Sequence, residues 1–112
     1  MSIDYTFGQI IIGGNTYTSD CIIYKEKVIP NWKRKKGHLF KLRDIKDLLN
    51  GKVDILVVGT GYNGIMKVDD SLKTYCKKNE IILADFPTQK AINYYESLGN
   101  KKRIILAMHI TC

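Results

Sequence analysis

The N-terminal quarter of the chain alternates short apolar runs with turn residues, a pattern typical of consecutive β-strands. Residues 7–12 form one apolar run, and Gly13-Gly14-Asn15 follows as a turn signal. Residues 16–24 are predicted as a second strand, and residues 28–29 as a third that ends at Pro30. The pattern therefore predicts a β-meander or a pair of hairpins.

The next part of the chain changes to helical spacing. Residues 31–41 have no clear period, and we expect them to form an ordered loop. Within residues 42–50, apolar side chains then recur at the spacing of one helix face, at Leu42, Ile45, Leu48 and Leu49. Because Asn50-Gly51 is a C-terminal stop signal, the pattern predicts a helix over residues 42–50.

The second half alternates continuous apolar strands with helical segments. Strands are predicted at residues 53–58, 81–84 and 103–110. Helices are predicted at residues 70–78, capped by Asp69 or Asp70, and at residues 89–98, capped by Thr88. Strands that are apolar on both faces need cover on both faces. The sequence therefore predicts one α/β domain over residues 1–112, a sheet flanked by helices in the order β-β-β-α-β-α-β-α-β.

Composition narrows the class of protein but assigns no reaction. The net charge is +7, from 18 Lys and Arg against 11 Asp and Glu. Only three of these cations are arginines, the residue suited to bidentate phosphate recognition, so we interpret the charge as a solvated basic surface. No apolar run is long enough to span a membrane. The odd, widely spaced cysteines Cys21, Cys76 and Cys112 predict a reduced, cytoplasmic protein.

A glycine loop follows the predicted strand at residues 53–58. Residues 59–64 match G-x-G-x-x-G, and Asp85 ends the next strand, where dinucleotide-binding folds place an acid. However, the next helix begins several residues after the loop, and its two aspartates would repel a phosphate. Three interpretations stay open: a dinucleotide site, a looser anion or small-ligand loop, and a structural turn. The candidate ligand-binding residues are Gly59, Thr60, Gly61, Asn63 and Gly64.

Two further groups of residues could carry function. In a strand, His109 and Thr111 would share one face and Cys112 would lie on the other. These three residues are either a nucleophilic Cys–His pair or a packed strand end, and we assign them no role. Trp32 and Arg34, with His38, lie in a basic segment. They could contact a protein partner, a ligand or single-stranded nucleic acid. The alternative is a tryptophan that pins the loop to the core, with solvated lysines outside.

No motif in the chain predicts an enzyme. CxxC, HExxH, GxSxG and Walker A sequences are all lacking. We therefore predict no catalytic residues, no metal ligands and no cofactor, and the sequence favours a non-enzymatic role.

Several short motifs occur in a characteristic order. They are Ser19-Asp20, Trp32-x-Arg34-x-x-x-His38, the Val-Val-Gly-Thr-Gly run at residues 57–61, Thr88-x-x-Ala91-x-x-x-Tyr95, and His109-x-Thr111-Cys112. Together they resemble the small domain family that contains the adipogenesis-associated domain protein and a mitochondrial complex I assembly factor, over nearly the whole chain. The resemblance implies a three-layer α/β domain with a mixed central sheet, whereas the apolar pattern alone favours a parallel second half. It also implies no nicotinamide or flavin chemistry and no established reaction.

Three hypotheses of function follow. The first, which we favour, is a binding or assembly module with a protein partner, because some relatives act as assembly or regulatory partners. We do not carry over the complex I role, since no mitochondrial targeting extension is visible. The second is a small-molecule or anion-binding protein, or a weak enzyme, that uses the glycine loop. If the last strand is parallel to residues 53–58, His109 and Cys112 meet that loop. Nucleic-acid binding is the least favoured, and a homodimer stays open.

Overall fold

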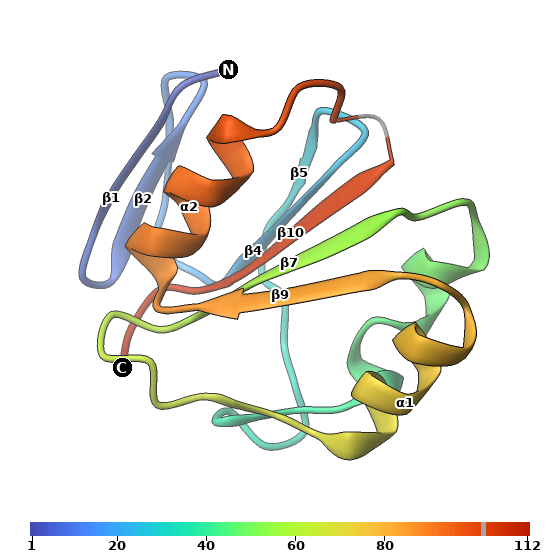
Figure 1. Cartoon of the computed structure of the whole chain (residues 1–112). Coiled ribbons are helices and arrows are strands. Elements are labelled where there is room, and N and C mark those ends of the chain that lie inside the picture. Colours follow the sequence, from blue (N-terminus) through green and yellow to red (C-terminus); the bar gives the residue numbers. More distant parts are fainter. Residues whose placement is uncertain (102) are drawn as a thin grey trace.

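The computed structural model describes residues 1–101 and 103–112. A five-stranded sheet in the order β5-β4-β10-β7-β9 runs through the middle of the molecule (Figure 1). Its strands are β4 (Cys21–Tyr24), β5 (Lys27–Ile29), β7 (Ile55–Thr60), β9 (Ile82–Phe86) and β10 (Ile104–His109). β10 is parallel to β7 and β7 to β9, but β10 is antiparallel to β4 and β4 to β5. The mixed sheet that the resemblance implies is therefore confirmed.

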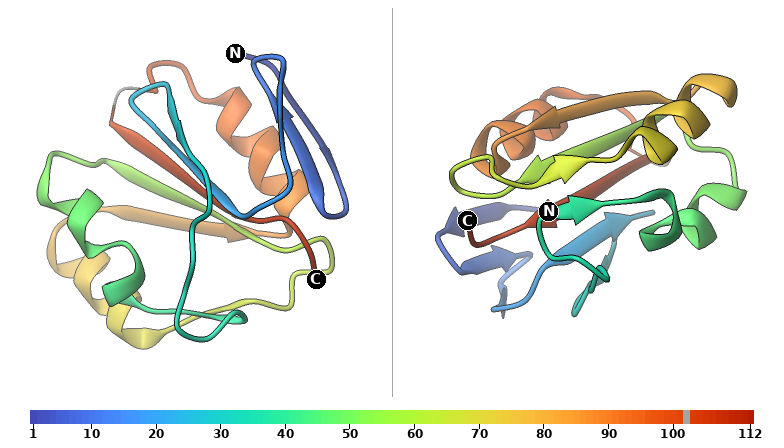
Figure 2. Two further views of the ribbon diagram at one scale, coloured as in Figure 1. Left: turned by 180° about the vertical axis from the view of Figure 1, so that it is seen from behind. Right: turned by 90° about the horizontal axis from the view of Figure 1, so that it is seen from below.

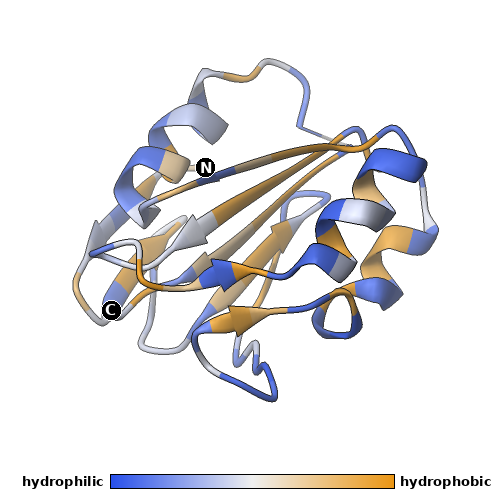
Figure 3. Ribbon diagram, turned by 60° about the horizontal axis from the view of Figure 1, so that its bottom comes forward, coloured by the Kyte–Doolittle hydropathy of each residue, from blue (hydrophilic) through white to orange (hydrophobic). Residues whose placement is uncertain are grey.

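The three interior strands of the sheet are apolar. All six residues of β10 are buried, as are five of the six in β7 and three of the four in β4. A strand can be apolar along its whole length only when both of its faces are covered, and this explains their place in the middle. Figure 3 shows the hydrophobic colouring along these strands.

The sheet is covered on both faces, so the molecule has three layers (Figures 1 and 2). One face is covered by α2 (Thr88–Ser97) and a three-stranded antiparallel sheet. The strands of that sheet are β1 (Ile3–Thr6), β2 (Gln9–Ile12) and β3 (Asn15–Tyr17). The other face is covered by α1 (Asp70–Lys78), the 3-10 segments η1 (Leu42–Asp44) and η2 (Lys46–Asn50), and the strand pair β6 (Leu39–Phe40) and β8 (Lys67–Val68).

The N-terminal strands differ from the prediction in two places. β1 precedes the predicted run, and residues 7–8 form the turn to β2. The predicted strand at residues 16–24 is two strands in two different sheets, β3 and β4. Its break falls at residues 18–20, where Ser19 Oγ accepts a hydrogen bond from Asn31 N–H and Asp20 turns inward to His109. These distant partners outweigh the local preference for one continuous strand.

The helix predicted at residues 42–50 is wrong. The segment forms η1 and η2, so the structure has two α-helices among the described residues and not three. An α-helix would pair Leu48 N–H with Asp44 O, but that carbonyl accepts from Trp32 Nε1, and Leu48 N–H donates to Ile45 O. Ile45 N–H likewise donates to Leu42 O, so these backbone bonds join residues three apart, as in a 3-10 turn.

The two α-helices begin in different ways. Asp69 caps α1, as predicted, because its carboxylate accepts from Ser71 N–H. The predicted Thr88 cap of α2 is wrong: Pro87 is the N-cap residue, and the Thr88 hydroxyl is used elsewhere. Neither of these helices, nor any other in the described residues, is long and apolar enough to cross a membrane.

Candidate functional site

The direction of β10 brings the C-terminal motif to the glycine loop. β10 is parallel to β7, and His109 pairs with Thr60 in the register of the two strands. The contact is so close that only glycine fits at residue 61. Gly61 has a φ of +108°, and a Cβ there would lie 2.3 Å from the carbonyl carbon of Cys112.

The N–H groups of the glycine loop bind the chain itself. Gly61 N–H donates to Thr88 Oγ1 (2.9 Å), Tyr62 N–H to Thr111 O (2.7 Å) and Ile65 N–H to Cys112 O (3.3 Å). The helix that follows the loop starts at Asp70, after β8, so the loop does not open a helix as a dinucleotide fingerprint requires. The contacts favour the structural-turn interpretation, and a ligand at this loop stays a prediction.

Thr88 joins the ends of three elements. Its hydroxyl donates to His109 O (2.6 Å) and accepts from Gly61 N–H, and the side chain is fully buried. A Cβ on Gly59 would lie 2.9 Å from the same hydroxyl. The start of α2 is therefore locked against the C-terminal ends of β7 and β10, which is why Thr88 cannot cap its own helix.

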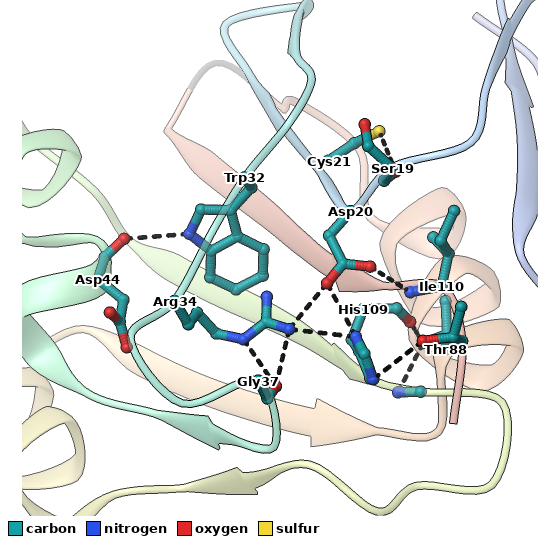
Figure 4. Close-up of polar contacts among 12 residues, drawn as sticks. Ser19, Asp20, Cys21, Trp32, Arg34, Gly37, Asp44, Thr88, His109 and Ile110 are labelled. Atoms are coloured by element: carbon teal, nitrogen blue, oxygen red, sulfur yellow. Dashed lines mark hydrogen bonds and ion pairs between the residues drawn. The ribbon is translucent and has the colours of Figure 1, made fainter.

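Asp20 is the centre of a buried polar network (Figure 4). Its Oδ2 lies 2.8 Å from both His109 Nδ1 and Arg34 Nη2, and its Oδ1 accepts from Ile110 N–H at 2.8 Å. The side chains of Arg34 and His109 are only 3% and 7% exposed. Burial opposes the charged carboxylate, but the hydrogen bonds from His109, Ile110 N–H and Arg34 hold the pKa of Asp20 below its usual range.

The carboxylate sets the orientation of the imidazole. His109 Nδ1 has two neighbours that need opposite roles: Arg34 Nη2 at 3.1 Å can only donate, and ionised Asp20 Oδ2 at 2.8 Å can only accept. The shorter contact, to Asp20, favours a hydrogen on Nδ1, which leaves Nε2 as the acceptor of a neutral ring. Thr111 Oγ1 lies 3.5 Å from Nε2, too far for a strong hydrogen bond. A histidine held in this way can act as a base. No group of three or more His, Cys, Asp or Glu residues in the described part of the chain is placed to hold a metal ion.

Trp32 and Arg34 lie inside the protein. The Arg34 guanidinium carbon is 4.4 Å from the centre of the Trp32 ring, and Nε and Nη2 both donate to Gly37 O. Trp32 is 8% exposed and packs edge-on against Phe40. Arg34 Nη1 is buried without a hydrogen-bond acceptor among the described residues.

The burial of Trp32 and Arg34 weighs against direct contact with a partner, which stays a prediction. The interior ion pair and the stacked rings hold both side chains in the core. The contacts favour the alternative, a tryptophan that holds the loop against the core. Of the three predicted contact residues only His38 is exposed, and its ring lies 5.4 Å from that of His109.

Sequence reasoning does not single out Asp20 or Thr88 as site residues. One feature of the sequence could have pointed to Asp20: it is the single charged residue in the strand predicted at residues 16–24. In the structure, the five motifs that carry the family resemblance meet at this edge of the sheet. Asp20, Arg34, Gly61, Thr88 and His109 each contribute a contact there.

An exposed aromatic surface lies beside the network and consists of Tyr5, Phe7 and Tyr62. The Phe7 and Tyr62 rings meet edge-on with their centres 5.8 Å apart, and they are 53% and 56% exposed. Tyr5 lies 6.2 Å from Tyr62, and burial, with the neighbouring Tyr62, raises the pKa of Tyr5 to about 12. A hollow of about 550 Å³ is lined here by Tyr5, Thr6, Phe7, Tyr62, Pro87 and Gln89.

The network and the aromatic surface share one segment of backbone. Ile110 O accepts from the Tyr5 hydroxyl (2.9 Å) and from Gly8 N–H (2.7 Å), while Ile110 N–H is held by Asp20. Thr111 O accepts from Tyr62 N–H. The turn that carries Phe7 and the loop that carries Tyr62 are thus both fastened to residues 110–111, which Asp20 holds in place.

Comparison with known proteins places the fold and the family. The family model described as "Protein of unknown function (DUF498/DUF598)" matches residues 3–110. The chain belongs to this family. The description of the family names no reaction, and the finer resemblance to the adipogenesis-associated domain protein stays a prediction.

Solved structures with the same fold match the chain over nearly its whole length. The conserved hypothetical protein PH1505 from Pyrococcus horikoshii OT3 is 26% identical, with a TM-score of 0.84 and 100% of both chains covered. The protein MT938 is 25% identical, with a TM-score of 0.71, and 99% of this chain and 100% of that chain are covered. XCC1710 from Xanthomonas campestris, at 13% identity and a TM-score of 0.73 over 98% of this chain and 86% of that chain, shows the fold alone.

Proposed function

We propose that this member of the DUF498/DUF598 family is a non-catalytic protein-binding module whose contact site is the aromatic surface. The observation that carries the proposal is the pair Phe7 and Tyr62, two adjacent aromatic side chains that are each more than half exposed. Aromatic residues are enriched at protein interfaces, and they are frequent among the residues that contribute most to affinity.

The way these side chains are held supports the proposal. Gly8 N–H fixes the turn beside Phe7 to Ile110 O, and Tyr62 N–H fixes its loop to Thr111 O. A surface that is already ordered loses little conformational freedom when a partner binds, so more of the contact energy appears as affinity. The small-ligand hypothesis has less support, because two N–H groups of the glycine loop already donate within the chain, Gly61 N–H to Thr88 Oγ1 and Tyr62 N–H to Thr111 O.

Capture from a cell extract with matched variants tests the proposal. Phe7→Ser and Tyr62→Ser remove the aromatic rings, and Ile82→Ser is the control, because Ile82 is 58% exposed but lies on the edge strand β9. We expect the wild type and the control to retain the same proteins and the two surface variants to lose them. Loss of an interface aromatic of this kind costs about 2 kcal/mol, roughly thirtyfold in affinity. Equal capture by all four folded proteins would refute the proposal.

A further inference from the structure

A continuous line of contacts leads from the aromatic surface to a basic loop, which we define as residues 33–38. Tyr62 N–H binds Thr111 O, Thr111 Oγ1 faces His109 Nε2, and the His109 ring lies 5.4 Å from that of His38. Arg34 ties the loop to the same network through Asp20. The aromatic surface and the basic loop therefore lie along the same edge of the central sheet.

The basic loop carries charge that the protein does not neutralise. Lys33, Lys35 and Lys36 are exposed, as is Lys67, whose N–H donates to His38 O. None of these four lysines forms an ion pair within the described residues. Residues 31–43 contain no Asp or Glu, and the nearby Asp20, only 14% exposed, is paired with Arg34. Asp69 lies two residues after Lys67, and its carboxylate accepts a hydrogen bond from Ser71 N–H at the start of α1. An anionic partner would therefore meet an excess of positive charge along the basic loop.

The hollow in the aromatic surface has the opposite character. None of its six lining side chains is charged. The acids nearest in sequence face elsewhere: Asp4 alternates with Tyr5 along β1, and Asp85 lines a separate hollow beside α1 with Lys73 and Lys77. Because a buried, unpaired charge is costly, the hollow suits a large apolar side chain.

We infer that one extended segment of an acidic protein partner occupies both features, with an apolar side chain in the hollow and carboxylates along the edge toward the basic loop. This inference rests on the proposed function and adds the chemistry of the partner. A second copy of the chain fits poorly, because each copy has a net charge of +7. Nucleic acid is also disfavoured, since the arginine of the loop, Arg34, is held in the buried ion pair and cannot grip a phosphate.

Titration of the ¹⁵N-labelled protein with synthetic peptides tests the inference by NMR. One peptide has a phenylalanine followed by a run of glutamates, and the second has glutamines in place of the glutamates. We expect the first to shift the amide signals of Phe7, Tyr62, Lys35 and Lys36. It should bind about three- to tenfold more tightly than the glutamine peptide, because each exposed ion pair adds little. That advantage should fade as the salt is raised from about 0.05 to 0.5 M.

Charge-reversal variants separate the basic loop from the overall charge. Lys35→Glu with Lys36→Glu should weaken the glutamate peptide by about three- to tenfold and leave the glutamine peptide unchanged. Lys27→Glu with Lys52→Glu is the matched control. Lys27 pairs with Tyr24 and Lys52 precedes β7, so both exposed residues lie near the N-terminal ends of β10 and β7, away from the basic loop. This control should bind both peptides as the wild type does.

Each contrary result has a distinct meaning. Equal affinity for the two peptides, or equal weakening by both double variants, would overturn the acidic chemistry. A single-stranded oligonucleotide that displaced the glutamate peptide and bound more tightly would overturn it in favour of nucleic acid. If the glutamine peptide still binds the aromatic surface in those cases, the proposed function stands. The proposed function fails separately if Phe7→Ser captures the same proteins as the wild type.

Discussion

Removal of the Asp20 carboxylate should destabilise this protein far more than removal of an exposed carboxylate that lies equally close to its own arginine partner. In Asp20→Ala the Arg34 guanidinium stays in the interior without its carboxylate, and His109 Nδ1 and Ile110 N–H both lose their acceptor. The side chains of Arg34 and His109 are too deeply buried for water to replace these contacts without rearrangement.

The expected loss follows from burial. Removing one partner of a buried ion pair costs about 3–5 kcal/mol, because it leaves an uncompensated charge in the interior. A domain of this size has a total stability of about 5–15 kcal/mol, so the variant should fold but unfold at a much lower denaturant concentration. Asp20→Asn, which keeps an oxygen for Ile110 N–H, should lose less.

Asp54 provides the matched control. Its Oδ1 lies 2.7 Å from Arg103 Nη2, almost the Asp20–Arg34 distance, but the two side chains are 53% and 50% exposed. Asp54→Ala should therefore cost no more than about 1 kcal/mol. Urea unfolding followed by far-ultraviolet circular dichroism measures both variants against the wild type. Equal losses for the two, or a loss below about 1 kcal/mol for Asp20→Ala, would show that the buried network does not hold this edge together.

Three further results are expected. The pKa of Asp20 is lowered in the folded state, so its stabilising effect is present above the usual Asp pKa of about 3.9 and is lost as the pH falls below that value. The difference in unfolding free energy between wild type and Asp20→Asn should therefore shrink from pH 5 to pH 3. A constant difference would contradict this. Gly61→Ala should cost at least about 2 kcal/mol in urea unfolding, through its positive φ and the clash with the last residue, against less than about 0.5 kcal/mol for Gly99→Ala, which has open space. In the native protein, a thiol reagent should label the half-buried Cys112 before Cys21, since burial raises the pKa of the Cys21 thiol to about 11. Mass spectrometry that finds Cys21 labelled as fast as Cys112 would refute this.

The three parallel strands and the two α-helices could be predicted from the sequence because their signals are local. Continuous apolar runs located β7, β10 and the edge strand β9, which is not buried on both faces, and the Asp69 cap marked the start of α1. The 3-10 turns of η1 and η2 could not be predicted from the same kind of pattern. One of their carbonyls, Asp44 O, accepts a hydrogen bond from Trp32 Nε1, twelve positions away in the chain, and a local pattern does not reveal such a partner.

The candidate site was only partly visible in the same way. The motifs named most of its residues, including His109 and Arg34, but they did not show that Trp32 and Arg34 are buried or that Asp20 joins them. An isolated aspartate in a strand is equally compatible with an exposed edge. Only its contact with His109, 89 positions later in the chain, distinguishes a buried network from a surface charge.

The sequence by itself determined the class of fold, because continuous apolar strands followed by helical segments require a sheet covered on both faces. Tertiary structure alone decided the direction of β10, the meeting of the glycine loop with Cys112, and the position of Phe7 beside Tyr62. These features depend on which distant groups share a buried environment. Desolvation makes an unpaired polar group costly there, whichever residues stand next to it in the chain.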